Sequence, residues 1–308
     1  MKHRRPAHAG RSAAQGRVLV SSALLGVALL AAPSARAEGP EVSIAINLGG
    51  EVWVEPTTVE ASLKPLFDAV ARTAKVTYSL RTAATVSDLH RMLAEGVANL
   101  GGSSPLTFVQ LAEKLKLRPV IKPVVAGSSD FRLLLLVRRS SGIARLEQLK
   151  GKTISLPEAP VVHQVYWDVF VAREGIRRPA GFFAGIKKKK KLESSVLDVF
   201  LGEADACLIA DVVYRAMVEL NPQLAKDLVA IHTSTAFSNF PLFATPKMRP
   251  DVLERGATAL TTLHFTKDGR QLLLMFKIDR LVRTQTSDYK TTFELWEAYK
   301  KLRVTSTP

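Results

Sequence analysis

Short apolar segments with the periods of strands and helices alternate along most of the chain. Segments typical of strands are 42–47, 75–80, 97–101, 117–125, 131–138, 153–156, 182–186, 206–209 and 228–231. Apolar residues at helical spacing predict helices at 57–73, 87–95, 105–114, 161–173, 194–201, from 211, and at 252–263, 268–276 and 289–302. This alternating order favours an α/β fold with parallel strand pairs and helices on both sheet faces.

The strand and helix alternation occurs as two sets, which predicts two lobes. The run Leu133 to Val137 is continuously apolar, as in strands that are covered on both faces. We expect one crossing between lobes near 127–131 and a return near 235–243. Lobe 1 then comprises residues 38–128 and 240–308, lobe 2 comprises residues 129–239, and a ligand cleft lies between them.

The segment from Ser141 to Pro157 is the strongest local signal. It predicts a turn, a short helix that ends at Gly151, and the apolar strand 153–156.

Residues 1–37 have the layout of a signal peptide. Five basic residues precede an apolar run at 18–32, which is followed by the small-x-small cleavage site Ala35-Arg-Ala37. The run has about fifteen residues, whereas a membrane span needs about 20. An uncleaved anchor is the alternative. The pair Arg4-Arg5 leaves both the general and the twin-arginine export routes open.

Charge and cysteine content narrow the functional classes. The formal net charge is +15, and removal of residues 1–37, with six basic residues and no acid, lowers it to about +9. The run Lys187 to Lys191 is typical of a solvated loop or helix start, and its alternative role is docking to an acidic partner or lipid surface. No basic stretch is interleaved with aromatics, so no nucleic acid is expected as a partner. A single cysteine, Cys207, excludes an internal disulfide.

The chain resembles the phosphonate-binding family of ABC-transporter periplasmic binding proteins over nearly all of residues 41–302. The segments that carry the resemblance are Pro65-Leu-Phe67, Leu100-Gly-Gly-Ser-Ser-Pro-Leu-Thr-Phe-Val109, Leu146 to Gly151, Gly202 to Asp211, and Thr233 to Pro241. The resemblance implies a type II periplasmic-binding-protein fold and a soluble periplasmic protein. Such a protein is expected to be a monomer without a cofactor, and to deliver a small anionic or zwitterionic ligand, phosphonate- or phosphate-like, to an ABC permease.

One segment departs from the family pattern. The family's Ser/Thr-rich turn that holds the phosphonate is replaced here by residues 157–164, which contain no hydroxyl side chain but include Glu158 and His163. We therefore expect simple alkylphosphonates to bind weakly.

Two other functional classes remain open at this stage, namely a module that feeds a sensor kinase or other receptor and an enzyme on the same fold. The enzyme class has little support. Cys207 lies in an apolar strand, where an inert thiol is expected. The sequence contains no nucleophile elbow and no metal-binding spacing of His or Cys.

Candidate ligand-binding residues follow from the rule that ligands bind beyond the carboxyl ends of strands. They are Ser103, Ser104, His163 and Asp211, with Asn47, Glu158 and Asn239 as weaker candidates. The turn that contains Trp53 is a further cleft candidate. Competing roles are a helix cap for Ser103 or Ser104, an N-cap for Asp211, and a surface histidine in a first helical turn for His163.

Overall fold

A computed structural model describes residues 41–48, 56–158, 161–176 and 179–305. The predicted signal peptide and Trp53 lie outside the described residues. The strands form a six-stranded sheet, a five-stranded sheet and a two-stranded ribbon. Within the described ranges, no helix is both long and apolar enough to cross a membrane.

The first sheet has the strand order β13-β4-β12-β3-β1-β2. Its strands are β1 (Val42–Asn47), β2 (Tyr78–Thr82), β3 (Leu100–Ser103), β4 (Arg118–Val124), β12 (Leu242–Ala244) and β13 (Arg280–Arg283). Strand β1 pairs in parallel with β2 and β3, whereas β12 runs antiparallel to β3 and β4. The carboxyl ends of β1, β2 and β3 therefore lie at one edge.

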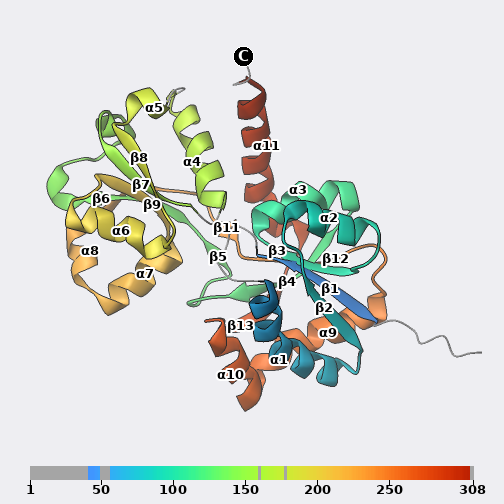
Figure 1. Ribbon diagram of the computed structural model, residues 1–308. Helices are drawn as coiled ribbons and strands as arrows, with labels where there is room; N and C mark the ends of the chain where they lie inside the picture. The colour runs from blue at the N-terminus through green and yellow to red at the C-terminus, as the bar shows by residue number, and fades with distance from the viewer. Residues whose placement is uncertain (1–40, 49–55, 159–160, 177–178, 306–308) are drawn as a thin grey trace, which may run out of the picture. The chain divides into compact units, whose positions relative to one another are not determined.

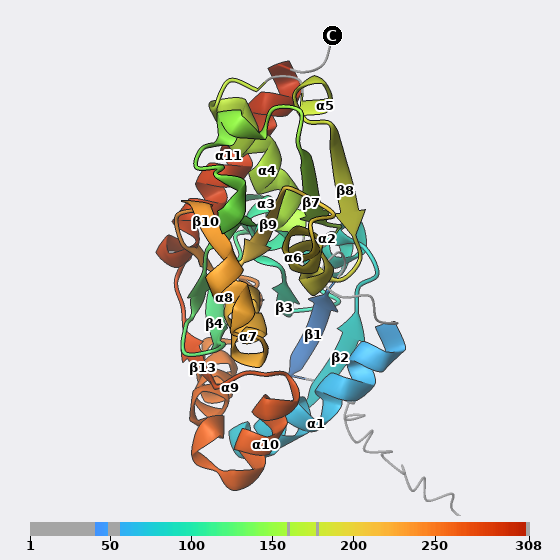
Figure 2. The same cartoon turned by 90° about the vertical axis from the view of Figure 1, so that its left-hand side faces the viewer.

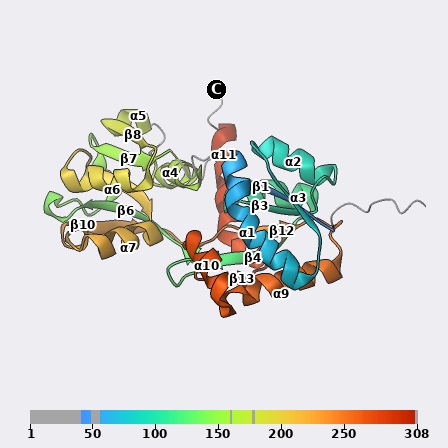
Figure 3. The same cartoon turned by 60° about the horizontal axis from the view of Figure 1, so that its bottom comes forward.

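Side-chain alternation in β1 assigns helices to the two faces of the first sheet (Figures 1 and 3). Val42, Ile44 and Ile46 join a core with α1 (Pro56–Ala74), α9 (Pro250–Thr262) and α10 (Lys267–Met275). Ala45 points to the opposite core, which contains α2 (Val86–Ala94), α3 (Pro105–Leu115) and α11 (Lys290–Thr305). Period-two alternation thus creates two apolar faces, and each is covered by helices.

The second sheet has the strand order β10-β6-β9-β7-β8. Figure 2 labels β10, β9, β7 and β8 of this sheet. Its strands are β6 (Leu133–Arg138), β7 (Thr153–Pro157), β8 (Gly185–Lys189), β9 (Ala206–Ala210) and β10 (Leu228–Thr233). In β6, Leu133, Leu135 and Val137 face the core with α4 (Val161–Arg173), while Leu136 faces α6 (Leu192–Leu201), α7 (Asp211–Leu220) and α8 (Gln223–Asp227). The prediction that this apolar run is covered on both faces is confirmed.

Two crossings join the sheets, as predicted. The chain leaves the first sheet after β4 and enters the second at β6, and it returns between β10 and β12. The crossings pair with each other as the ribbon of β5 (Asp130–Phe131) and β11 (Phe237–Ser238). A further link is α11, which contacts α3 beside the first sheet, α4 beside the second, and β11.

Several predicted elements are shifted or wrong. The strand predicted at 97–101 begins three residues later, so both glycines and Ser103 belong to β3. The strand predicted at 182–186 is misplaced along the chain. Pro179–Phe182 forms the helical turn α5, and strand β8 extends through Lys189. The short helix before Gly151 is a 3₁₀ turn, Leu146–Leu149. Strand β13 and helix α8 were missed.

The lysine run was predicted as a loop or helix start, and this is correct only for its end. Lys187 to Lys189 belong to strand β8, whereas Lys191 is the N-cap of α6. Strand β8 is at the edge of the second sheet, where lysines discourage pairing with another chain. The Lys187 ammonium donates to the Glu203 carbonyl at 2.7 Å, and that of Lys189 lies 2.9 Å from an Asp198 carboxylate oxygen. These local partners explain how adjacent positive charges are accommodated in a strand.

The glycines of β3 are required by close packing. A Cβ on Gly101 would lie 2.3 Å from the ring of Phe243, which is fully buried. That ring in turn packs on Phe108, with ring centroids 5.3 Å apart. An aromatic ring can therefore lie directly on the β3 backbone only where the strand has no side chain.

We predict that Gly101→Ala destabilises the protein by about 1–3 kcal/mol, the usual cost of overpacking a core. Gly256→Ala is the matched control, since its Cβ would meet nothing within 4 Å and alanine favours the α9 helix. Urea unfolding followed by circular dichroism measures both. Equal stability of the two variants would contradict the packing argument.

Candidate functional site

The carboxyl edge of the first sheet places Asn47 beside Ser103. The two residues are partners in the β1–β3 register, and both are buried. The Asn47 amide nitrogen donates to the Ala83 carbonyl, which follows β2, at 2.8 Å. Its Oδ1 is buried and has no hydrogen-bond partner among the described residues. A buried acceptor without a partner is expected to receive a hydrogen bond from water or a ligand.

Ser103, the last residue of β3, and Ser104, which follows it, make internal hydrogen bonds. Ser104 is the N-cap of α3: its Oγ accepts from the Thr107 backbone N–H at 3.2 Å and donates to the Thr107 hydroxyl at 3.1 Å. The Ser103 hydroxyl donates to the Ser104 carbonyl at 3.2 Å. The cap role is therefore observed for Ser104, and Pro105 occupies the first turn as is usual for such caps.

At the corresponding edge of the second sheet, Asp211 binds backbone. One carboxylate oxygen accepts from the Arg132 backbone N–H at 2.9 Å, and the Asp211 N–H donates to the Arg132 carbonyl at 2.8 Å. The other oxygen is 3.8 Å from the Arg215 guanidinium. The predicted N-cap role is wrong, because Ala210 is the N-cap of α7 and has no capping side chain.

Glu158 and His163 follow β7 in the same sheet. The Glu158 N–H donates to the Lys189 carbonyl at 2.8 Å, and the Glu158 carbonyl accepts from the side-chain amide of Gln164. His163 is only 1% exposed in the first turn of α4, so the alternative of a surface histidine is wrong. Burial lowers the pKa of nearby Lys188, while the carboxylates of Asp168 and Glu158 oppose this shift.

Asn239 lies where the return crossing meets the first. Its amide nitrogen donates to the carbonyls of Pro123 and Ser128 at 3.3 and 3.4 Å, and its backbone N–H donates to the Ser129 carbonyl. Its carbonyl accepts from the Tyr289 hydroxyl at 3.0 Å. These bonds hold the two crossings together. Because β12 runs antiparallel to β3 with Leu242 opposite Gly102, Asn239 precedes β12 on the side of the sheet where β3 ends.

Sequence reasoning missed Arg132 and Ser234. Arg132 precedes β6, and because β6 runs antiparallel to β9 and β10, this residue lies at their carboxyl edge. Its guanidinium is exposed and donates to the Ser234 carbonyl at 3.0 Å. The Ser234 hydroxyl accepts from the Leu133 N–H at 2.8 Å. The available signal was that Thr233-Ser-Thr235 begins two residues after the end of the predicted strand 228–231.

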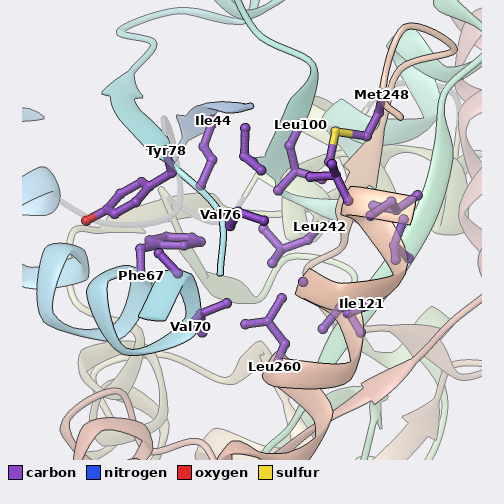
Figure 4. A pocket seen from close by; sticks show the side chains of 17 residues that line it. Ile44, Phe67, Val70, Val76, Tyr78, Leu100, Ile121, Leu242, Met248 and Leu260 are labelled. Carbon is purple, nitrogen blue, oxygen red and sulfur yellow. The ribbon is translucent and has the colours of Figure 1, made fainter. Parts of the chain in front are cut away.

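An apolar pocket in the first sheet does not suit a charged ligand. It lies between β1, β3 and β4 on one side and α1 and α9 on the other, and Figure 4 shows its side chains. A neighbouring apolar cavity of about 370 Å³ shares Phe67, Ile121, Leu242 and Leu260 with it. The lining provides almost no group that could hydrogen-bond an anion, and an unpaired charge there would be costly.

The described residues contain no group of three or more metal-ligating side chains. Cys207 is fully buried, and burial raises the pKa of its thiol, as expected for an inert cysteine.

Comparison with solved structures gives the same fold. XAC2383 from Xanthomonas citri has been solved with chloride and also with ATP, and both structures superpose on this chain with a TM-score of 0.66. In the chloride complex the sequence identity is 18%, and the superposition covers 85% of this chain and 99% of that chain. A binding protein component of an ABC phosphonate transporter from Pseudomonas aeruginosa has a TM-score of 0.61 and 12% identity, covering 86% and 88%.

PhnD1 from Prochlorococcus marinus, solved in complex with methylphosphonate, has a TM-score of 0.61 and 14% identity, covering 85% of this chain and 99% of that chain. At these identities the structures establish the shared two-lobed fold.

No curated protein matches the sequence. Residues 52–289 match the family model described as ABC transporter, phosphonate, periplasmic substrate-binding protein. This match covers more than half of the chain, and the protein therefore belongs to that family of ABC-transporter substrate-binding proteins.

Proposed function

We propose that this member of the family binds a small phosphonate that also carries an amine, between the carboxyl edges of its two sheets. The observation that supports this ligand most is the pair of opposite charges at the edge of the second sheet. The guanidinium of Arg132 is exposed there, and the carboxylate of Asp211 is held against the backbone of the same residue.

The chemistry of these groups matches a zwitterion. A guanidinium binds tetrahedral oxyanions through two parallel hydrogen bonds. A carboxylate and a buried amide oxygen accept hydrogen bonds from an ammonium group, and Asp211 and Asn47 provide these acceptors. A ligand with only an alkyl group beside its phosphonate would leave both acceptors without a new donor.

The remaining site assignment keeps the seven candidates and adds Arg132. Ser103 and Ser104 would face the anion once their hydroxyl protons rotate from their internal acceptors. His163 and Glu158 would contribute from the turn after β7. Asn239 would contribute from the return crossing, where its amide hydrogen-bonds the backbone carbonyls of Pro123 and Ser128.

The cellular role follows from the family, whose members work outside the cytoplasm with an ABC transporter. We propose that cleavage after Ala37 releases a soluble monomer into the periplasm, with lobe boundaries at 128/129 and 239/240, and that it delivers its ligand to the permease without catalysing a reaction. The lysine-rich edge of β8 offers positive charge for docking.

In a thermal-shift screen of phosphonates, phosphate, phosphite, sulfonates, carboxylates and amino acids, we expect 2-aminoethylphosphonate to raise the melting temperature most. Methylphosphonate should have little effect, because it lacks the amine and the hydroxyl-rich turn is absent from residues 157–164. The screen uses the chain from residue 38 onward. Tighter binding of methylphosphonate than of the aminophosphonate would contradict the proposed ligand class.

Substitutions at the charge pair should reduce affinity selectively. Arg132→Gln should weaken binding of both phosphonates about 10- to 150-fold, since one charge-assisted hydrogen bond is worth about 1.5–3 kcal/mol. Asp211→Asn should weaken only the amine-bearing ligand to a similar extent. Arg72→Gln, on an exposed arginine of α1, is the control. Calorimetric titration measures all three, and unchanged affinity in Arg132→Gln would show that the anion binds elsewhere.

A further inference from the structure

A single buried ammonium group joins the links between the two sheets. Lys122 lies in β4 of the first sheet and is 6% exposed. Its Nζ lies 3.1 Å from Asp130 Oδ1, 2.8 Å from Ser238 Oγ and 3.3 Å from Asp288 Oδ2. An ammonium group has three donors, and three partners are within reach.

Each partner belongs to a different link. Asp130 is in β5 on the first crossing and Ser238 is in β11 on the return, and they are register partners in the ribbon. The Ser238 hydroxyl donates to the same Asp130 oxygen at 2.7 Å. Asp288 precedes α11, the helix that contacts α3 and α4. Lys122 therefore ties all three links to the first sheet.

Asp288 is itself held in its ionised form. It accepts a hydrogen bond from the Thr284 hydroxyl at 2.7 Å. Burial acts to raise its pKa, but this hydrogen bond and the Lys122 charge outweigh burial, and the pKa lies below its usual value. The acceptor for the ammonium is therefore a carboxylate.

A second set of bonds ties the same crossings to the other sheet. The Asp211 carboxylate accepts from the Arg132 N–H, the Asp211 N–H donates to the Arg132 carbonyl, and the Ser234 hydroxyl accepts from the N–H of Leu133. Between the two sets lie only Phe131 on the first crossing and residues 235–237 on the return. The rings of Phe131 and Phe237 stack there with centroids 5.7 Å apart.

We propose that Lys122 is a positioning residue for closure: it clamps the Asp130–Ser238 end of the ribbon to the first sheet, so that bending is confined to Phe131 and residues 235–237. Hinge motions are absorbed by a few residues at element ends, and fixed flanks determine which residues those are. Lys122 thereby controls how much of the unliganded protein is competent to bind, and apparent affinity scales with that fraction. This inference rests on the proposed function only for its affinity readout.

The test measures the distance between the sheets by single-molecule FRET, with dyes on cysteines introduced at the exposed residues Glu95 and Glu193. Cys207 is fully buried and does not compete for labelling. In Lys122→Met, the unliganded distance distribution should broaden, and affinity for 2-aminoethylphosphonate should fall by about 10-fold. Lys152→Met is the charge-matched control, because its exposed ammonium is 4.0 Å from Asp205 within the second lobe.

If Lys122→Met does not fold, the double variant Lys122→Met/Asp288→Asn removes one uncompensated carboxylate and is measured in its place. A folded Lys122 variant whose unliganded distance distribution equals that of the wild type would overturn the proposal. The proposal would also fail if Lys152→Met broadened the distance distribution as much as Lys122→Met. The unliganded distances do not depend on ligand identity. A wild type that binds no phosphonate would therefore refute the proposed ligand and leave this test intact.

Discussion

The arrangement of the two sheets depends most directly on the contacts that the buried ammonium of Lys122 makes with Asp130, Ser238 and Asp288. A buried charge loses its hydration, and this loss is compensated only where several well-placed acceptors replace the water. Here the acceptors come from both crossings and from the segment before α11. Because one group serves all three, a shift of any link changes the environment of the others. The two crossings and the segment before α11 are thereby coupled to one another through β4.

The apolar core supports the same connection. One core extends from Ala45 and Phe108 at the first sheet through Tyr289 and Leu295 to α4 and the strands of the second sheet. Tyr289 is fully buried against Phe108 and hydrogen-bonds the Asn239 carbonyl at the return crossing. Polar contacts thus define positions at the crossings, and the packing of α11 provides the buried surface that stabilises them.

The candidate site is built largely from groups that also support the backbone. Ser104 caps a helix, Asp211 binds the N–H of Arg132, and Asn47 bridges to the turn after β2. These structural hydrogen bonds hold the polar side chains in place before ligand arrives, so less conformational entropy is lost on binding. Arg132 has a guanidinium that is anchored at one nitrogen and exposed elsewhere, which suits a residue that must meet an incoming anion.

Apolar periodicity in the sequence alone determined most elements, the two sets of strands and the two crossings. The reason is that a segment such as Leu133 to Val137 is stable only when helices cover both of its faces. The sequence also placed Asn47 and Ser103 at strand ends, but the N-cap role that it offered as an alternative for Asp211 is wrong, and it did not predict that Lys187 to Lys189 form a strand. Only the tertiary structure decided these, along with Arg132, Ser234 and the clamp at Lys122. Their partners lie up to 166 positions away along the chain, as Asp288 does from Lys122, and pairing between distant segments has no signature in local periodicity.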